Sequence, residues 1–494
     1  MTARLTMPKL LLLLVEIIAY AILGVVASSH FGFGDGMRIT LAYLVAYLVP
    51  CIVLERSRGN SIAARIVLII LAVFLMFVGY KLLLHCTFFD DYTLQFPNLE
   101  GDQRRYYKWA LHQYDGSVDA TTVVFPGFPI MMLALWKVLG VNVVWPQSMN
   151  MMFTLLSTVL VGLTTRRLLV DKVHASPRAL VAGGMLLTGV LMYYQTMGVC
   201  ILKDSPTYLA VAMAGFSLSS MVSVDDDRHM LWRDFLVFVL ACLLIGLVRT
   251  TYIYFLILGL FIMVLPHWRR DWRMALAMLL VACISLFAGD QLSAYSFDRH
   301  AEIIGGGWNM QRFYVISESQ QFYHDLLNYY FLYSPWHKAL MLPLTMSVQF
   351  IIPLPWTYYE NSTVLSVLSR MTYGWYFVGG TALFYYLFLS WRRSEMLGAW
   401  VWWPAICYAC LAYIMAGSVA RYVSPIQPLF APVAMYVICR LFEGRWRKAF
   451  MIWAVFFTVL LVSALLLCLE IQQAAISKML HTQSLLHYLR GRGW

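Results

Sequence analysis

Asp102 stands at the start of a polar segment whose spacing predicts a helix. Tyr106, Trp109, Ala110 and Gln113 recur at positions i, i+3, i+4 and i+7, so they share one face of that helix. A carboxylate in the first turn can cap the free N–H groups of the helix. It can equally act as a general base if the helix lies where water meets lipid. The spacing alone leaves both interpretations open.

Other charged residues compete for a chemical role. Asp204 follows Lys203 at the mouth of a predicted helix pair, where a Lys–Asp pair, a helix cap and a functional carboxylate are equally compatible with the pattern. Arg249 interrupts about 30 apolar residues, which is costly in a membrane unless it marks a turn or a site. Three further acids precede Asp102 and are either rival bases or solvated loop charges: Asp90, Asp91 and Glu100.

A second polar segment contains Trp308 within the run G-G-G-W-N-M-Q-R-F-Y, residues 305–314. The triple glycine is no phosphate loop, because no Gly-Lys-Ser/Thr follows it. Aromatic and amide side chains suit a sugar or acceptor surface, but an interfacial aromatic belt uses the same residues. His300, His324 and His337 lack metal-ligand spacing, so no metal site is predicted.

The elements that position these residues must be membrane helices. Of 494 residues, 61% are hydrophobic and only 12% are charged, and the mean hydropathy is +0.70. This composition excludes a disordered chain, a coiled coil and an ordinary soluble enzyme, whose charged fraction is about 25%. Nine scattered cysteines form neither a disulfide framework nor a zinc site. We expect about thirteen transmembrane helices, near residues 10–29, 37–54, 64–84, 147–165, 179–200, 206–223, 234–248, 250–266, 274–292, 373–390, 396–416, 423–441 and 449–470.

Basic clusters predict the orientation of these helices. The positive-inside rule assigns the clusters to the cytoplasmic side, which requires that the apolar stretches 127–139 and 340–356 lie on the membrane surface. The amino terminus is then cytoplasmic, and the two long connections are external. The net charge of +11 therefore reflects orientation and not nucleic-acid binding. The clusters are Arg56/Arg58/Arg65, Arg166/Arg167/Lys172/Arg178, Arg269/Arg270/Arg273, Arg392/Arg393 and Arg445/Arg447/Lys448.

The order of motifs on the predicted outer face resembles the GT-C superfamily of membrane glycosyltransferases. It is similar in particular to protein O-mannosyltransferases and lipid A aminoarabinose transferases, which depend on polyprenyl-phosphate sugars. The sequence departs from their pattern in having two additional helices before the first loop, Gln103 where Glu is common, and no Lys directly before the proline turn. The matching elements are Asp102, Tyr106 and Ala110, then Pro126, Gly127 and Pro129, Leu133–Gly140, Leu155–Leu169, Leu202–Ser205, Gly246–Arg249 and Ala420–Pro428.

The resemblance implies a GT-C-like organisation in four parts. Residues 1–63 are the two additional helices, and residues 64–292 are the core with a first external catalytic loop at 85–146. Residues 293–372 are a second external loop with interfacial helices, and residues 373–494 are the carboxy-terminal helices and tail. The expected location is the bacterial inner membrane, with the site facing the periplasm.

The resemblance also implies a chemistry, namely sugar transfer from a polyprenyl-phosphate donor to a hydroxyl of an envelope glycan, lipid or protein. The reaction would be of the inverting type. Asp102 would be the general base, and Asp204 would bind the acceptor or a metal, or orient Asp102. A divalent cation is compatible with the resemblance, although no ligand set is legible. The residues for the donor phosphate would be Arg421, Lys203, Arg249 and Arg105, and those for the substrate would be Tyr106, Trp308 and Tyr422.

Two alternative functions remain open. An O-antigen polymerase or ligase using a polyprenyl-pyrophosphate glycan also has many helices and a large outer loop, but it favours an arginine-rich late loop. A transporter of lipid-linked glycans predicts internal repeats and charged residues near the membrane midplane. The acidic element in the first loop, and spans that are almost free of central charge, favour the transferase.

Overall fold

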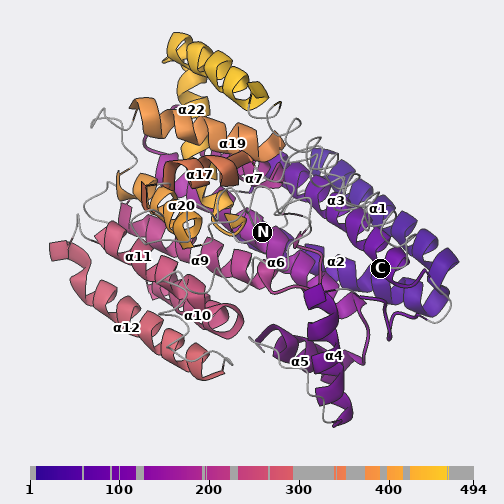
Figure 1. The fold of residues 1–494 in the computed structure, drawn as a ribbon. Coiled ribbons are helices and arrows are strands. Elements are labelled where there is room, and N and C mark those ends of the chain that lie inside the picture. The colour runs from indigo at the N-terminus through magenta and orange to yellow at the C-terminus, as the bar shows by residue number, and fades with distance from the viewer. Residues whose placement is uncertain are drawn as a thin grey trace, which may run out of the picture.

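The computed structural model is all-helical (Figure 1). It describes residues 7–57, 60–88, 92–99, 101–117, 127–191, 195, 197–222, 232–264, 268–292, 339–340, 342–351, 373–389, 398–414, 423–463 and 466. The amino-terminal helices are α1 (Met7–Phe31), α2 (Phe33–Arg56), α3 (Ile62–Cys86), α4 (Gly101–Asp115), α5 (Gly127–Leu139) and α6 (Val144–Leu169).

The middle and the carboxy-terminal parts are also helical. The middle part contains α7 (Pro177–Gly189), α9 (Asp204–Val222), α10 (Trp232–Val248), a 3-10 turn (Thr250–Tyr252), α11 (Ile253–Val264) and α12 (Trp268–Leu292). The last part contains α17 (Leu342–Ile351), α19 (Tyr373–Phe384) with a π-helical turn (Tyr385–Leu389), 3-10 turns at Gly398–Val401 and Gln427–Phe430, α20 (Trp402–Ile414), α22 (Ala431–Phe442) and a final helical stretch at residues 447–463.

Helices occupy all thirteen ranges expected from the sequence, but most of them do not qualify as spans by the length and composition of their described residues. Five of the described helices are long and apolar enough to cross a membrane: Leu10–Phe31, Phe33–Arg56, Ile62–Cys86, Val144–Leu169 and Trp272–Gly289. The chain is thus a helical, multi-pass membrane protein with five candidate spans in its described part. The stretch expected at 179–200 is the clearest correction, because α7 ends at Gly189 and an irregular turn follows at 198–203.

The two apolar stretches that were predicted to lie on the membrane surface form short helices. Helix α5 has 13 residues and α17 has 10. At 1.5 Å per residue they are about 20 Å and 15 Å long, whereas the bilayer core is about 30 Å thick. Their lengths are compatible with the predicted surface position.

Helix α6 lies at the centre of the amino-terminal part and packs against α2, α7 and α9. Small residues allow its close approach to α7, as is typical between membrane helices. A methyl group built on Gly184 would come within 2.4 Å of Thr165 Oγ1, and one built on Gly162 would come within 2.6 Å of the Met185 side chain. Many polar side chains of α6 are buried, and Thr154, Thr158 and Thr165 bond to backbone carbonyls of α6 itself.

The ends of α3 and α6 meet at one end of the bundle. The N–H of Asn98 donates to the carbonyl of Cys86, the last residue of α3, at 2.8 Å. The N–H of Val143, just before α6, donates to the carbonyl of Leu94 at 2.9 Å. At the opposite end of α6, Arg167 Nη2 lies 3.3 Å from Asp234 Oδ1 at the start of α10. The helices therefore alternate in direction.

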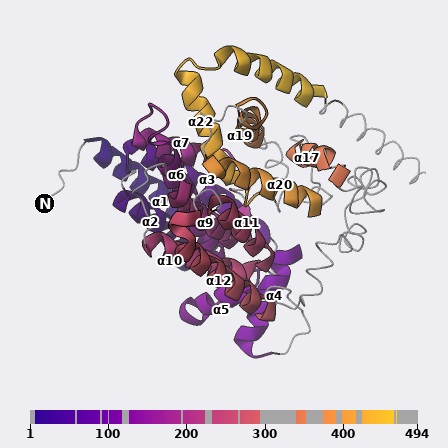
Figure 2. The same ribbon diagram turned by 90° about the vertical axis from the view of Figure 1, so that its left-hand side faces the viewer.

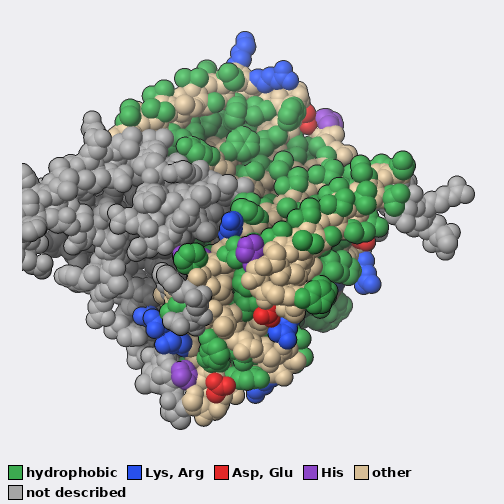
Figure 3. Space-filling model, turned by 90° about the vertical axis from the view of Figure 1, so that its right-hand side faces the viewer, with side chains coloured by type: hydrophobic (Ala, Val, Ile, Leu, Met, Phe, Trp, Pro, Cys, Tyr) green, Lys and Arg blue, Asp and Glu red, His purple; other side chains and the backbone are tan. Residues whose placement is uncertain are grey.

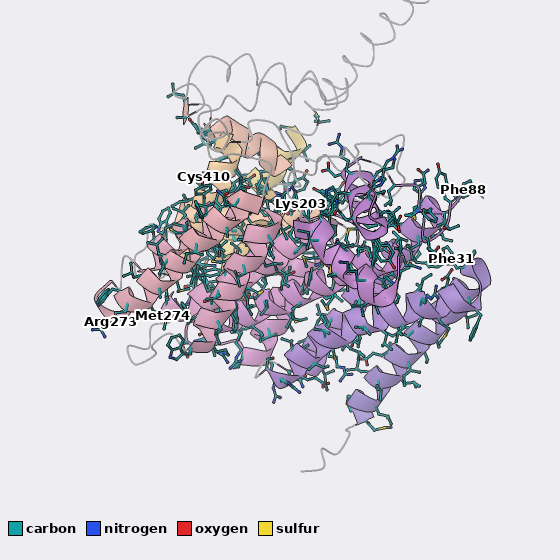
Figure 4. All side chains as sticks on the ribbon, turned by 90° about the horizontal axis from the view of Figure 1, so that it is seen from below. Phe31, Phe88, Lys203, Arg273, Met274 and Cys410 are labelled. Carbon is teal, nitrogen blue, oxygen red and sulfur yellow. The ribbon has the colours of Figure 1, made fainter. Side chains whose placement is uncertain are left out.

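Arg273, which the sequence assigns to the cytoplasmic side, lies away from the ends of α1 and α3. In the view from below, Arg273 near the start of α12 lies at one margin of the molecule (Figure 4). Phe31, the last residue of α1, and Phe88, two residues after α3, lie at the opposite margin. Helices α4 and α5 pack together and lie at the bottom of the views in Figures 1 and 2. Helices α4 and α5, which belong to the predicted catalytic loop, are thus separated from Arg273.

An ionic clamp joins the first three helices. Arg65 of α3 contacts both carboxylate oxygens of Glu16 of α1, at 2.9 and 3.0 Å, and Tyr47 of α2 donates to the same carboxylate at 2.6 Å. Arg65 also bonds Glu55 at 2.7 Å. An acidic residue inside a membrane helix is costly unless it is paired, so this clamp accounts for Glu16 in an otherwise apolar helix. Hydrophobic side chains cover much of the described surface on the face in Figure 3, as contact with lipid requires.

Candidate functional site

Asp204 and Arg249 form a buried ion pair between two helix ends. Asp204 is the first residue of α9, and Arg249 directly follows α10. Arg249 Nη1 lies 3.4 Å from Asp204 Oδ1, and the two side chains are 4% and 0% exposed. The guanidinium also lies 5.3 Å from the ring centre of Tyr252. Removing two charges from water is costly unless they compensate each other, so the pair ties α9 to the turn after α10.

The irregular turn before Asp204 is held by side chains from α6 and α9. The amide of Asn150, in α6, donates to the carbonyls of Cys200 and Leu202. Ser205 Oγ donates to the carbonyl of Gly198 at 3.1 Å. A buried turn needs partners of this kind because its backbone polar groups lack a regular helical ladder. These bonds fix the backbone from which Lys203 and Asp204 project.

Helix α4 is attached to the same turn next to Asp102. The N–H of Ile201 donates to Gln103 Oε1 at 3.0 Å. Gln103 is the neighbour of Asp102 in the chain, and Ile201 precedes Asp204 by three residues. This contact brings together two segments that the sequence separates by about a hundred residues. Asp102 lies in the first turn of α4, as predicted, and its side chain is 40% exposed.

Helix α5 brings α4 to the end of α10. A methyl group built on Gly127 would lie 1.9 Å from the carbonyl oxygen of Leu247, so only glycine allows this approach. Tyr106 of α4 packs edge to face against Phe128 of α5, with ring centres 5.9 Å apart. Since Leu247 precedes Arg249 by two residues, α4 and α5 together lie beside the ion pair.

A second attachment of α4 involves Tyr107. Its hydroxyl donates to the carbonyl of Gln95 at 2.7 Å. Burial, and then the nearby Cys86 thiol, raises the pKa of Tyr107 well above the usual value for a phenol. The hydroxyl therefore stays protonated and keeps donating, which holds α4 against residues 92–99.

Of the remaining predicted site residues, some lie in the described part of the chain and others do not. Lys203 is half-buried beside Asp204, and Arg105 is 70% exposed with Nη1 4.0 Å from Asp102 Oδ1. Tyr106 is buried in the contact with α5. Several predicted residues lie outside the described residues: Arg421, Tyr422, Trp308, Pro126, Asp90, Asp91, Glu100, His300, His324 and His337.

The described chain just after Arg421 is connected to α9. The hydroxyl groups of Ser424 and Tyr208 are 2.9 Å apart and both are buried. Tyr208 lies about one helical turn after Asp204, and Ser424 follows Arg421 by three residues. Ser424 and the ion pair are therefore tied to the same helix at positions close in the chain.

Sequence reasoning missed the residues that assemble the site. Gln103 was noted only as a departure from a family pattern, and Asn150 was not singled out. Asn150 Oδ1 and Thr250 Oγ1 are buried and have no hydrogen-bond partner among the described residues. The available signal was polarity inside an apolar run, since polar residues in membrane helices usually serve packing or function.

The described residues contain no group of three or more His, Cys, Asp or Glu side chains arranged to hold a metal ion. In chemical terms the site offers a water-accessible carboxylate, at least two nearby cationic side chains and a buried ion pair. Such a set can accept a proton and offset a negative charge. No protein-family model, no curated protein and no solved structure matches the chain.

Proposed function

We propose that this protein is a membrane glycosyltransferase of the GT-C type. It moves a sugar from a polyprenyl-phosphate donor to a hydroxyl of an envelope glycan, lipid or protein. In this proposal about thirteen transmembrane helices carry two long external loops with juxtamembrane helices. The site faces the periplasm of a bacterial inner membrane.

The observation that carries the proposal is the Gln103–Ile201 hydrogen bond. It joins α4, whose first turn holds Asp102, to the turn that leads into Asp204. The resemblance rests on motifs spread over several hundred residues, and it has chemical meaning only if those motifs meet. The first loop, the turn before α9 and the turn after α10 each carry one of these motifs. Because these three segments lie side by side, the structure supports this proposal.

Asp102 is the general base of the proposed reaction. Its side chain is the more accessible of the two acidic candidates, at 40% exposed against 0% for Asp204. A base must reach the proton that it accepts, either directly or through one water. Asp204 and Arg249 neutralise each other in the interior, so we assign them to positioning the start of α9 and not to contact with the substrate.

The departing phosphate needs positive charge on the same side. Arg105 lies one turn after Asp102, and Lys203 precedes Asp204 in the turn bonded to α4. Arg421 is the third proposed phosphate residue, and it is three residues before Ser424, which is bonded to α9. Arginine and lysine side chains offset the charge of phosphate oxygens, which is a large contribution in transfer reactions of this kind.

Sugar transfer by purified protein tests the proposal. The protein is reconstituted in proteoliposomes and supplied with radiolabelled polyprenyl-phosphate sugars, labelled polyprenyl-pyrophosphate glycans and envelope acceptors, with Asp102→Asn beside the unchanged chain. Loss of a general base lowers the rate by about 10²–10⁴-fold. Asp115→Asn is the matched control, because Asp115 is an exposed acid at the other end of α4.

Three outcomes are decisive. Transfer that disappears in Asp102→Asn and persists in Asp115→Asn supports the base assignment, whereas full activity of Asp102→Asn rejects it. Transfer from polyprenyl-pyrophosphate glycans alone replaces the proposal by a polymerase or ligase. Movement of labelled lipid-linked glycan across the vesicle without any transfer replaces it by a transporter.

A further inference from the structure

The carboxy-terminal part contains an apolar cavity of ≈ 340 Å³. Its wall is formed by α17, α19, α20, the turn at Gln427–Phe430 and the final helical stretch at residues 447–463. Figure 2 shows that α17, α19 and α20 lie close together beneath the final stretch. Aromatic side chains dominate its wall, among them Phe350, Trp375, Tyr408, Phe430 and Phe457, and Met346 adds one thioether. None of the proposed catalytic residues belongs to the wall.

The polar atoms of four wall residues are already used within the protein. Each donates its hydrogen to a backbone carbonyl, so none of the four has a hydrogen left to donate to a ligand. An occupant would therefore meet mainly carbon, and an apolar ligand is the one that this wall favours. The four bonds run from Ser347 to Pro343, from Trp375 to Phe350, from Tyr386 to Val401 and from Tyr408 to Met346.

The cavity reaches the apolar surface of the protein. Trp402 and Leu460 both line it and are 45% and 51% exposed. Phe377 and Phe456, on the same group of helices, are exposed as well. In a multi-pass membrane protein an exposed apolar helix surface faces hydrocarbon. The species most available at this opening are therefore the acyl chains of bilayer lipids.

We propose that this cavity is a binding site for the acyl chain of a bilayer phospholipid. A dry apolar cavity of about 150 Å³ binds benzene, so ≈ 340 Å³ holds roughly a dozen carbon atoms. That size matches a segment of one hydrocarbon chain, and acyl chains are the hydrocarbon chains that a bilayer supplies in greatest amount. The site goes beyond the proposed sugar transfer, since no step of that reaction requires it.

An acyl chain in this position would connect the final helix to the rest of the carboxy-terminal part. Phe457 contributes to the wall from one side, and Trp375 and Tyr408 contribute from α19 and α20. The indole of Trp453 already donates to the carbonyl of Gly380 at 3.3 Å across this contact. A bound chain would add dispersion contacts between the same helices.

Photo-crosslinking of lipid in nanodiscs tests the site. The full chain is reconstituted with a phosphatidylcholine that carries a diazirine in one acyl chain, and labelled peptides are mapped by mass spectrometry. Ala405→Phe fills the cavity from α20, and Leu460→Trp narrows its opening from an exposed position. Ala454→Phe is the matched control, because Ala454 is partly buried on the final helix but does not line the cavity.

We expect labelled peptides from α19, α20 and residues 447–463, with at least a fivefold loss in Ala405→Phe and Leu460→Trp and no change in Ala454→Phe. Thermal unfolding verifies that each variant is folded, and Leu460→Trp carries the test if Ala405→Phe is not. Equal labelling in all variants, or labelling confined to other helices, overturns the proposal. Displacement of the probe by equimolar polyprenyl phosphate overturns the phospholipid assignment. Since crosslinking needs no sugar transfer, a failed transferase assay leaves this result intact.

Discussion

The guanidinium of Arg249 and the carboxylate of Asp204 compensate each other in the protein interior, with Nη1 3.4 Å from Oδ1. The pair connects the beginning of α9 to the end of α10, and the turn leading into Asp204 also binds α4 through Gln103. Perturbing this connection, or the two contacts that hold α4 and α5 beside it, gives testable consequences.

Breaking the ion pair from one side should destabilise the protein. Arg249→Met or Asp204→Leu takes one charge out of the pair and leaves the other buried without this partner, which costs about 3–5 kcal/mol, whereas the double variant removes both charges and should lose much less. The free energy of unfolding of all four proteins in detergent forms a double-mutant cycle that measures the coupling. Additive losses would contradict the pairing. A positioning role predicts that kcat falls in the single variants and recovers in part in the double variant.

Removing the acceptor at Gln103 should loosen α4. Gln103→Ala leaves the buried N–H of Ile201 without this partner, at a cost of about 1–3 kcal/mol. Hydrogen exchange of residues 101–115 should become faster, while Gln103→Glu, which keeps an acceptor oxygen, should preserve the protection. Gln113→Ala changes an exposed glutamine on the same helix and serves as control. Unchanged exchange in Gln103→Ala would contradict the role of this bond.

Adding a methyl group at Gly127 should separate α5 from α10. The Cβ would lie 1.9 Å from the carbonyl of Leu247, so the backbones must move apart, and overpacking of this kind costs about 1–3 kcal/mol or more. Gly127→Ala should therefore lower the unfolding temperature. Gly34→Ala is the control, since a methyl group there meets nothing within 4 Å. Equal unfolding temperatures for the two variants would refute the close approach.

Glu443 should make stability depend on pH in the acidic range. Burial raises the pKa of Glu443, but the backbone N–H of His174 and then the Arg440 guanidinium lower it more, and the net pKa lies below its ordinary value of 4.5. A depressed folded-state pKa stabilises the protein above the unfolded-state value, and this contribution disappears as the pH falls through the folded-state pKa.

The difference in unfolding temperature between the unchanged chain and Glu443→Gln should accordingly be largest near neutral pH and shrink below about pH 4.5. Glu55→Gln is the control, because it removes a different acid, the one that bonds Arg65 in the ionic clamp. A difference that stays constant from pH 7 to pH 3 would show that the Glu443 carboxylate has no such role.

The sequence was informative where the pattern is local. The apolar runs predicted helices in all thirteen ranges, and the spacing from Asp102 to Gln113 predicted α4, which runs from Gly101 to Asp115. Arg249 was predicted to mark a turn or a site, and it directly follows α10. These features depend on residues a few positions apart, so periodicity and helix-breaking charge reveal them.

The sequence by itself determined that this is a helical membrane protein and which few polar residues stand apart from its apolar runs. Only the tertiary structure decided that Asp204 pairs with Arg249, that α7 stops at Gly189, and that Gln103 attaches Asp102's helix to the turn before α9. The physical reason is that burial, desolvation and a hydrogen-bond partner are properties of segments brought together from distant parts of the chain, and no local pattern contains them.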